Sequence, residues 1–207
     1  MFPLGTVLFP GQVLPLHVFE LRYRALTREC LAGDRRFGVV LIERGPEVGG
    51  GDVRFGIGTV AEIAEAAELP DGRFALLAVG VTRFRVHTWL PDDPYPQAVV
   101  EELPEPADPH RAGEPILAGL EPAERAVRRA LALGAELGLD QGVPGGVPVS
   151  DDPTTALWQL CALAPIGPFD RQRLLEAETS ADRAALLEQV ATEAAERFGY
   201  HLSGGPE

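Results

Sequence analysis

The pattern of the sequence changes once, at a proline-rich stretch between residues 104 and 115. Before this stretch, short apolar runs alternate with Gly, Pro and Asp turn residues, whereas after it alanine- and leucine-rich segments follow a helical period. Residues 104–115 contain four prolines and few apolar residues, which is typical of a linker. We therefore predict an α+β protein with a strand-rich domain at 1–103, a linker at 104–115 and a small helical bundle at 116–207.

Six or seven short strands are predicted in the first domain, at a spacing typical of a small barrel or a two-sheet structure. The candidate strands cover residues 7–9, 13–19, 37–42, 56–63, 74–81, 83–90 and 97–103, and a short helix is predicted over 20–31. Pro15 lies inside the second strand and cannot donate to a ladder, so this strand is expected at a sheet edge or a bulge. Glycines at 56, 58 and 80 are expected where strands bulge or approach closely.

Local capping signals place the helices of the second domain. The predicted helices cover 116–139, ending near Gly138, then 153–163 behind an Asp152 N-cap, then 170–176, and a last helix that Thr179 and Asp182 open and Gly199 closes.

The basic residues exclude several chemistries, because all 18 are arginine and the chain contains no lysine. A Walker A loop, a Ser-Lys dyad and Schiff-base catalysis each require a lysine amine. Residues 1–90 carry ten acidic and ten basic side chains, whereas the remainder carries 21 acids against eight arginines and accounts for the net charge of −13. Because an acidic field repels phosphate, nucleic acid is not an expected partner.

Other site chemistries find no support in the residue spacing. Histidines at 17, 87, 110 and 201 lack a metal-ligand spacing, and serines at 150, 180 and 203 lack a Gly-x-Ser-x-Gly elbow. No catalytic residue, metal or cofactor is therefore expected. Cys30 and Cys161 lie far apart, and no apolar run reaches membrane-spanning length, so we expect a cytoplasmic protein in a reducing compartment that does not engage a membrane.

A family resemblance extends over several linked blocks. The opening blocks are Phe2-Pro3-Leu4, Val7-Leu8-Phe9-Pro10-Gly11, Leu14-Pro15-Leu16-His17-Val18-Phe19-Glu20 and Arg22-Tyr23-Arg24. Together with later blocks at 34–41, 56–61, 69–73 and 79–86, they resemble the N-terminal substrate-binding domain of Lon proteases. The resemblance weakens over 104–151 and returns from residue 152.

This resemblance implies a PUA-like β-barrel followed by a helical bundle. It also implies recognition of unfolded or client polypeptides, and it leaves open whether a separate protease receives them. In Lon proteases the ATPase and Ser-Lys peptidase domains carry the catalysis, and a chain without lysine can hold neither. We therefore expect a non-enzymatic recognition or adaptor module, with a small-molecule-sensing PUA-like domain as the alternative.

Candidate residues follow from the expectation that a polypeptide-binding surface is apolar and partly exposed. The peptide-binding candidates are Phe9, Pro10, Val13, Leu14, Trp89 and Tyr95, together with the glycine-rich loop 45–52. A structural role is expected instead for Glu20, Arg22, Tyr23, Arg83 and Phe84, because partly buried charges are usually paired.

Overall fold

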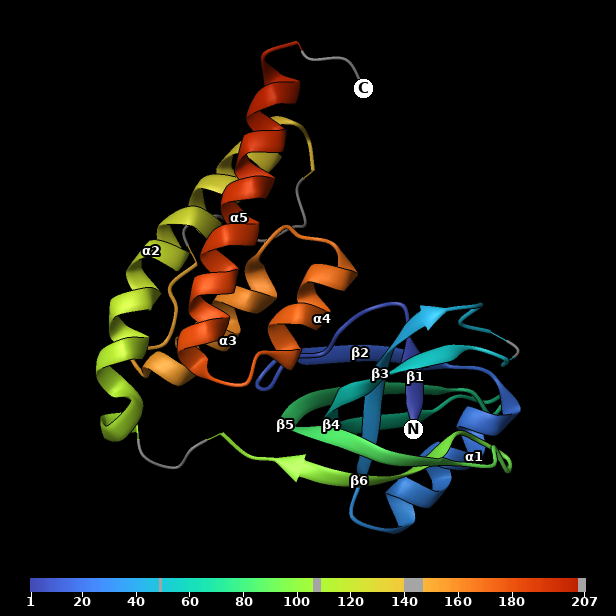
Figure 1. Cartoon of the computed structure of the whole chain (residues 1–207). Coiled ribbons are helices and arrows are strands. Elements are labelled where there is room, and N and C mark those ends of the chain that lie inside the picture. Colours follow the sequence, from blue (N-terminus) through green and yellow to red (C-terminus); the bar gives the residue numbers. More distant parts are fainter. Residues whose placement is uncertain (49, 106–108, 140–146, 205–207) are drawn as a thin grey trace. The chain divides into compact units, whose positions relative to one another are not determined.

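The computed structural model describes residues 1–48, 50–105, 109–139 and 147–204, with only the backbone described for 109–118. The chain divides into two compact units, Met1–Glu105 and Pro106–Glu207, and each is considered by itself (Figure 1). The predicted linker at 104–115 differs from this description, because helix α2 already begins at Pro109.

The first unit is a six-stranded mixed sheet with one helix. Its elements are β1 (Phe2–Leu4), β2 (Val13–Val18), α1 (Leu21–Ala32), β3 (Arg36–Arg44), β4 (Val53–Glu68), β5 (Phe74–Leu90) and β6 (Gln97–Leu103). The strand order is β1-β3-β4-β5-β2, and β6 also pairs with β5. β1 runs parallel to β3, and all other pairs are antiparallel.

The predicted closed barrel is wrong, because β1 and β2 end the path of the sheet and do not pair with each other. β5 pairs along 74–79 with β2 and along 83–90 with β6, so its second edge is divided between two strands. β1 has three residues, and β2 contains Pro15, which lacks a donor. Neither strand therefore offers the long, uninterrupted ladder that closure requires.

Several local predictions are confirmed. β6 covers the predicted residues, β2 is an edge strand, and β3 is buried on both faces over Phe37–Leu41. The predicted strand at 7–9 is wrong, since these residues are buried but lie outside any strand. The two strands expected at 74–81 and 83–90 form one continuous strand.

Two glycines allow backbones and side chains to approach closely in the core of this unit. A Cβ atom at Gly58 would lie 2.3 Å from the Val39 carbonyl oxygen and 2.6 Å from Cζ of the fully buried Phe84. A Cβ at Gly80 would lie 2.2 Å from the Phe9 carbonyl oxygen. The prediction that these glycines mark close approaches or bulges is confirmed by close approach at these two positions. At Gly56 a Cβ would meet nothing within 4 Å, but the β3–β4 register shifts between the Val40–Gly58 and Ile42–Arg54 pairs, as predicted for a bulge.

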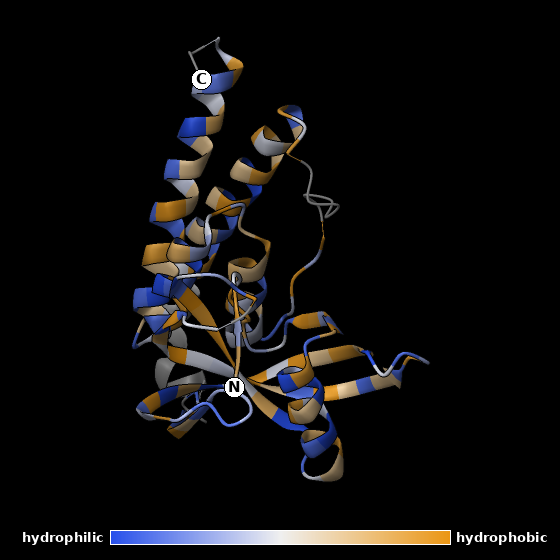
Figure 2. Cartoon of the chain, turned by 90° about the vertical axis from the view of Figure 1, so that its right-hand side faces the viewer, coloured by the Kyte–Doolittle hydropathy of each residue, from blue (hydrophilic) through white to orange (hydrophobic). Residues whose placement is uncertain are grey.

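The second unit is helical. Its helices are α2 (Pro109–Glu136), α3 (Pro153–Leu163), α4 (Pro168–Glu176) and α5 (Ser180–Leu202). The predicted caps are present: Asp152 accepts from the Thr155 N–H and Thr179 accepts from the Asp182 N–H. Gly199 does not close the last helix, which continues to Leu202. Bands of hydrophobic and hydrophilic residues alternate along α5 (Figure 2), as expected for a helix with one packed face.

A buried arginine links three helices of this unit. The Arg183 side chain is fully buried, and its Nε and Nη2 donate to the carbonyl oxygens of Leu174 and Ala177 at 3.1 and 3.0 Å. Its guanidinium carbon lies 3.8 Å from the centroid of the Trp158 ring. These contacts connect α5 to the C-terminal end of α4 and to α3, and they satisfy carbonyl groups that a helix end leaves without partners.

No helix among the described residues is long and apolar enough to cross a lipid bilayer.

Two glycines on β4 give a direct test of the core packing. Gly58→Ala places a methyl group against the Val39 carbonyl oxygen, so we expect a loss of about 2 kcal/mol in the free energy of unfolding. Gly56→Ala meets open space and serves as the matched control, for which a change of less than about 0.5 kcal/mol is expected. Urea denaturation followed by circular dichroism measures both, and equal midpoints for the two variants would contradict the packing described here.

Candidate functional site

An apolar groove of about 250 Å³ lies where the two end strands of the sheet come close without pairing. Its lining comprises Phe2, Leu4, Leu16, His17, Val18, Phe19, Glu20, Tyr23, Glu47 and Val48. β1, β2, the start of α1 and the loop after β3 thus all contribute to one surface. Most of the lining is apolar, and Phe19 and Val48 are each 54% exposed.

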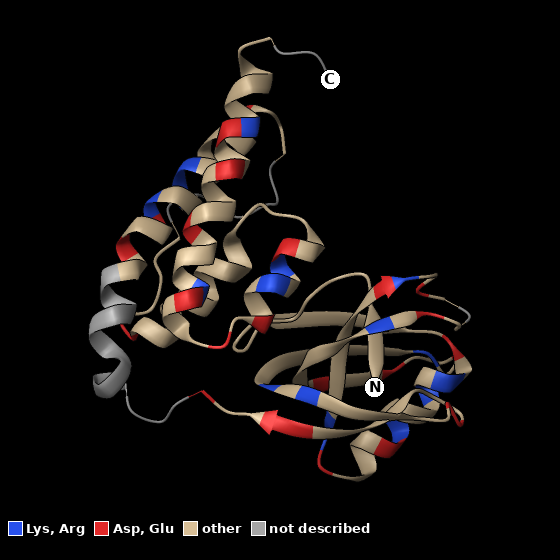
Figure 3. Ribbon diagram, in the orientation of Figure 1, with Lys and Arg blue, Asp and Glu red and all other residues tan. Residues whose placement is uncertain are grey.

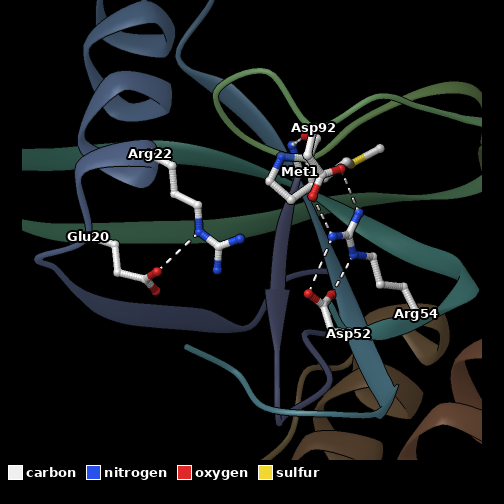
Figure 4. A network of polar contacts seen from close by, with 7 residues as sticks. Met1, Glu20, Arg22, Asp52, Arg54 and Asp92 are labelled. Atoms are coloured by element: carbon white, nitrogen blue, oxygen red, sulfur yellow. Dashed lines mark hydrogen bonds and ion pairs between the residues drawn. The ribbon is translucent and has the colours of Figure 1, made fainter. Parts of the chain in front are cut away.

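A stack of side chains forms one wall of the groove. The rings of Phe2 and Tyr23 stack with centroids 4.2 Å apart, and the guanidinium carbon of Arg22 lies 4.4 Å from the Tyr23 centroid. Arg22 Nε donates to Glu20 Oε2 at 3.1 Å (Figure 4). Burial raises the pKa of Tyr23 to about 12, so its hydroxyl stays neutral at physiological pH. Glu20, Arg22 and Tyr23 therefore fix the wall of the groove through contacts with one another and with β1.

The open edge of β2 borders the groove. The Gly80 N–H donates to the Gln12 carbonyl oxygen at 2.9 Å, and this bond sets which residues of β2 hydrogen-bond to β5. The backbone groups of Leu14, Leu16 and Val18 consequently face β5, and those of residues 13, 15 and 17 face the open edge. Pro15 thus falls at a position where its missing N–H removes no ladder bond.

The sequence-predicted binding residues do not form a single site. Phe9 is fully buried, so the proposal that it lies on an exposed turn is wrong. Tyr95 is buried as well and donates from its hydroxyl to Glu29 Oε2. Pro10 is half-buried beside Phe9, whereas Val13 is 52% exposed and Leu14 packs against the core, both on β2.

Trp89 lies in a different, shallow hollow of about 440 Å³ that also involves Gly51, Asp52, Val53, Arg54 and Asp92. The guanidinium carbon of Arg54 lies 5.0 Å from the centroid of a Trp89 ring. Arg54 donates to Asp52 at 2.5 Å and to Asp92 at 2.8 Å (Figure 4), and nearby the amino group of Met1 donates to the Pro96 carbonyl oxygen. Trp89 is thus half-buried, and its ring lies against the guanidinium of Arg54.

The two remaining residues with an expected structural role lie in the core of the first unit. Arg83 is 6% exposed and pairs through Nη2 with Glu105 Oε1 at 3.0 Å, and Phe84 is fully buried against Gly58.

Sequence reasoning missed most of the groove. Phe2, Leu4, Leu16 and Phe19 were not among the candidates, and β1 reaches the site only through its parallel pairing with β3. The candidate loop 45–52 does contribute to the groove, through Glu47 and Val48. The alternation along β2 and the apolar Phe19 directly before a helix start were the available signals. Among the described residues no three His, Cys, Asp or Glu side chains gather as metal ligands, and the side chain of His110 lies outside this description.

Comparison with known proteins connects this geometry to one family. The model of the ATP-dependent protease La (LON) substrate-binding domain matches residues 1–192. A Lon protease of Cytophaga hutchinsonii is 30% identical over 188 residues, which are 90% of this chain and 23% of that protein. A Lon protease 2 of Myxococcus xanthus is 34% identical over 101 residues, covering 48% of this chain and 12% of that protein.

Solved structures show the same fold. The Lon N-terminal domain protein from Xanthomonas campestris superposes with a TM-score of 0.60 at 28% identity, covering 90% of this chain and 94% of that one. The N-terminal domain of the Mycobacterium avium complex Lon protease gives a TM-score of 0.59 at 17% identity, covering 92% and 97%. The chain thus spans less than a quarter of the Cytophaga relative but nearly all of these isolated domains.

The Arg54 network gives a test of the electrostatics beside the groove. Burial acts to raise the pKa of Asp52, but hydrogen bonds from Arg54 and from the backbone outweigh burial and lower it. Arg54→Met removes the partner of a carboxylate whose side chain is 2% exposed, so we expect a loss of about 3 kcal/mol in the free energy of unfolding at neutral pH.

The pH dependence follows from the direction of the shift. Because the pKa of Asp52 is lower in the folded than in the unfolded chain, its stabilisation is present above the unfolded pKa and is lost as pH falls through the folded pKa. The difference between wild type and Arg54→Met should therefore shrink in acid, and the double variant Asp52→Asn/Arg54→Met should regain part of the loss at neutral pH. Urea denaturation midpoints of wild type, Arg54→Met and the double variant, measured from neutral to acidic pH, check both statements.

Proposed function

Since the chain belongs to the family of the LON substrate-binding domain, we propose that it is a non-catalytic polypeptide-recognition module that captures client segments in the groove between β1 and β2. The observation that carries this proposal is the apolar groove beside the open edge of β2, which is lined by side chains of both end strands and by the exposed Phe19 and Val48. An apolar groove next to an open strand edge suits an extended chain, because backbone groups on the edge give affinity and side-chain pockets give selectivity.

The size of the groove favours a side chain over a metabolite. Pockets for drug-sized ligands typically enclose about 300–1,000 Å³ and bury most of the ligand. The groove measures about 250 Å³, is open along one side and is lined mainly by aliphatic and aromatic groups. It therefore offers few polar groups with which to orient a small polar molecule, and this supports polypeptide capture over the alternative of a small-molecule sensor.

In this proposal the chain binds client polypeptides and catalyses no reaction on them. These 207 residues contain no lysine for the ATPase or peptidase chemistry carried out by the other domains of Lon proteases, so we assign to them the capture of a client and not its processing. Delivery to a protease is one such use, and the same groove also suits an adaptor that only retains clients.

Two exposed phenylalanines provide a matched test of capture. Phe19→Ser removes an apolar side chain that is 54% exposed in the groove, and Phe169→Ser removes one that is 57% exposed on α4 of the second unit. We expect Phe19→Ser to weaken binding of a reduced, denatured model protein by about tenfold, as expected for the loss of a buried aromatic contact of about 1.4 kcal/mol. Phe169→Ser should bind like wild type.

Fluorescence anisotropy with labelled, denatured protein gives the affinities, and circular dichroism shows that both variants are folded. Equal binding by the two variants would remove the groove as the capture site. A large thermal upshift with a metabolite, without binding to denatured protein, would favour the small-molecule alternative.

A further inference from the structure

The charge around the groove is uneven in a way that selects among client segments. Two carboxylates, Glu20 and Glu47, belong to its lining, and no arginine does. Glu20 is balanced by Arg22 at 3.1 Å. Glu47 is exposed and lies near Gly5, where a Cβ atom would be 3.5 Å from its Oε2. The rim of the groove on the side of Glu47 therefore carries negative charge next to an apolar floor.

The apolar floor and the open edge of β2 lie side by side. Leu16 and Val18 of β2 line the groove, while the backbone groups of residues 13, 15 and 17 point away from β5. An extended segment that pairs with this edge has side chains alternating between the groove and the solvent face. Such a segment can place one apolar side chain between Phe2 and Leu16 and bring a neighbouring residue to the rim.

We propose that the groove selects extended segments in which an apolar residue is flanked by lysine or arginine. The segment adds to the open edge of β2, its apolar side chain fills the groove, and its basic side chain lies against Glu47. Acidic flanks are disfavoured at the same rim by repulsion from the same carboxylate. This inference rests on the proposed function, and it adds the class of segment and the direction of its backbone contacts.

Two labelled peptides test the charge selection. Both carry the same Val-Leu-Phe core, flanked in one by lysines and in the other by glutamates. At low salt we expect the lysine-flanked peptide to bind wild type about tenfold more tightly, with the ratio falling as salt screens the rim. Glu47→Arg should reverse or abolish this preference. Glu102→Arg, an equal charge change at an exposed residue of β6, should leave it unchanged.

The outcomes separate this inference from the proposed function. If both peptides bind wild type equally well, and Phe19→Ser weakens both, the groove captures polypeptides without charge selection and the inference fails alone. If Phe19→Ser affects neither peptide, the proposed site fails. If both Glu47→Arg and Glu102→Arg lose the preference for the lysine-flanked peptide, the preference comes from the overall charge of the protein. This result would also overturn the role of Glu47.

A substitution in β2 tests the backbone contact. Pro15 leaves the open edge without one N–H group, and Pro15→Ala restores that donor without touching the pairing with β5. We expect Pro15→Ala to bind the lysine-flanked peptide about threefold more tightly. The gain should be lost with an N-methylated version of the peptide, because the methyl groups prevent its backbone from pairing with the edge of β2. An unchanged or weaker affinity in a variant with an unaltered circular dichroism spectrum would show that the segment does not run along β2.

Discussion

The contact between the Phe9 carbonyl oxygen and Gly80 fixes the geometry on which the groove depends. The oxygen lies where any Cβ at residue 80 would clash, so the chain before β2 can cross β5 only at a glycine. Gly80 also exchanges hydrogen bonds with Gly11 and Gln12 at this crossing, at 2.8 and 2.9 Å. Because β-sheet register has a period of two, this one crossing decides which face and which edge each residue of β2 presents.

The divided edge of β5 leaves the sheet open, and the open sheet creates the groove. β5 spans 17 residues; its first part pairs with β2 and its later part pairs with β6. β1, which pairs only with β3, and β2 are therefore left as the ends of the path. A closed barrel would pair β1 with β2, whereas the open sheet leaves between them a groove of about 250 Å³ that Leu4 and Leu16 both line. Acidic and basic residues occur in both units, on the strands and α1 of the first and along the helices of the second (Figure 3).

The parts of the structure that the sequence predicts are those with local causes. The Asp152 and Thr179 caps and the edge position of the strand containing Pro15 each follow from the chemistry of one or two neighbouring residues. The parts that it does not predict depend on distant pairing. β1 joins the sheet through residues 39–41, and Arg183 reaches carbonyl groups on another helix. No local pattern distinguishes the buried Phe9 from the exposed Phe19, because both are apolar residues next to turns.

Pro15 limits how readily the open edge of β2 can accept further strands. An exposed edge next to an apolar groove is a template on which other copies of the chain can add strands, and natural sheets often block such edges with proline or charge. Here the proline removes one donor from the outer edge and none from the ladder with β5, so the edge is weakened as a template without loss of internal stability. The remaining carbonyl groups and the N–H groups of Val13 and His17 still allow a short, weak pairing. An edge of this kind suits transient capture of many segments, because affinity then comes from the side chain in the groove more than from a long ladder.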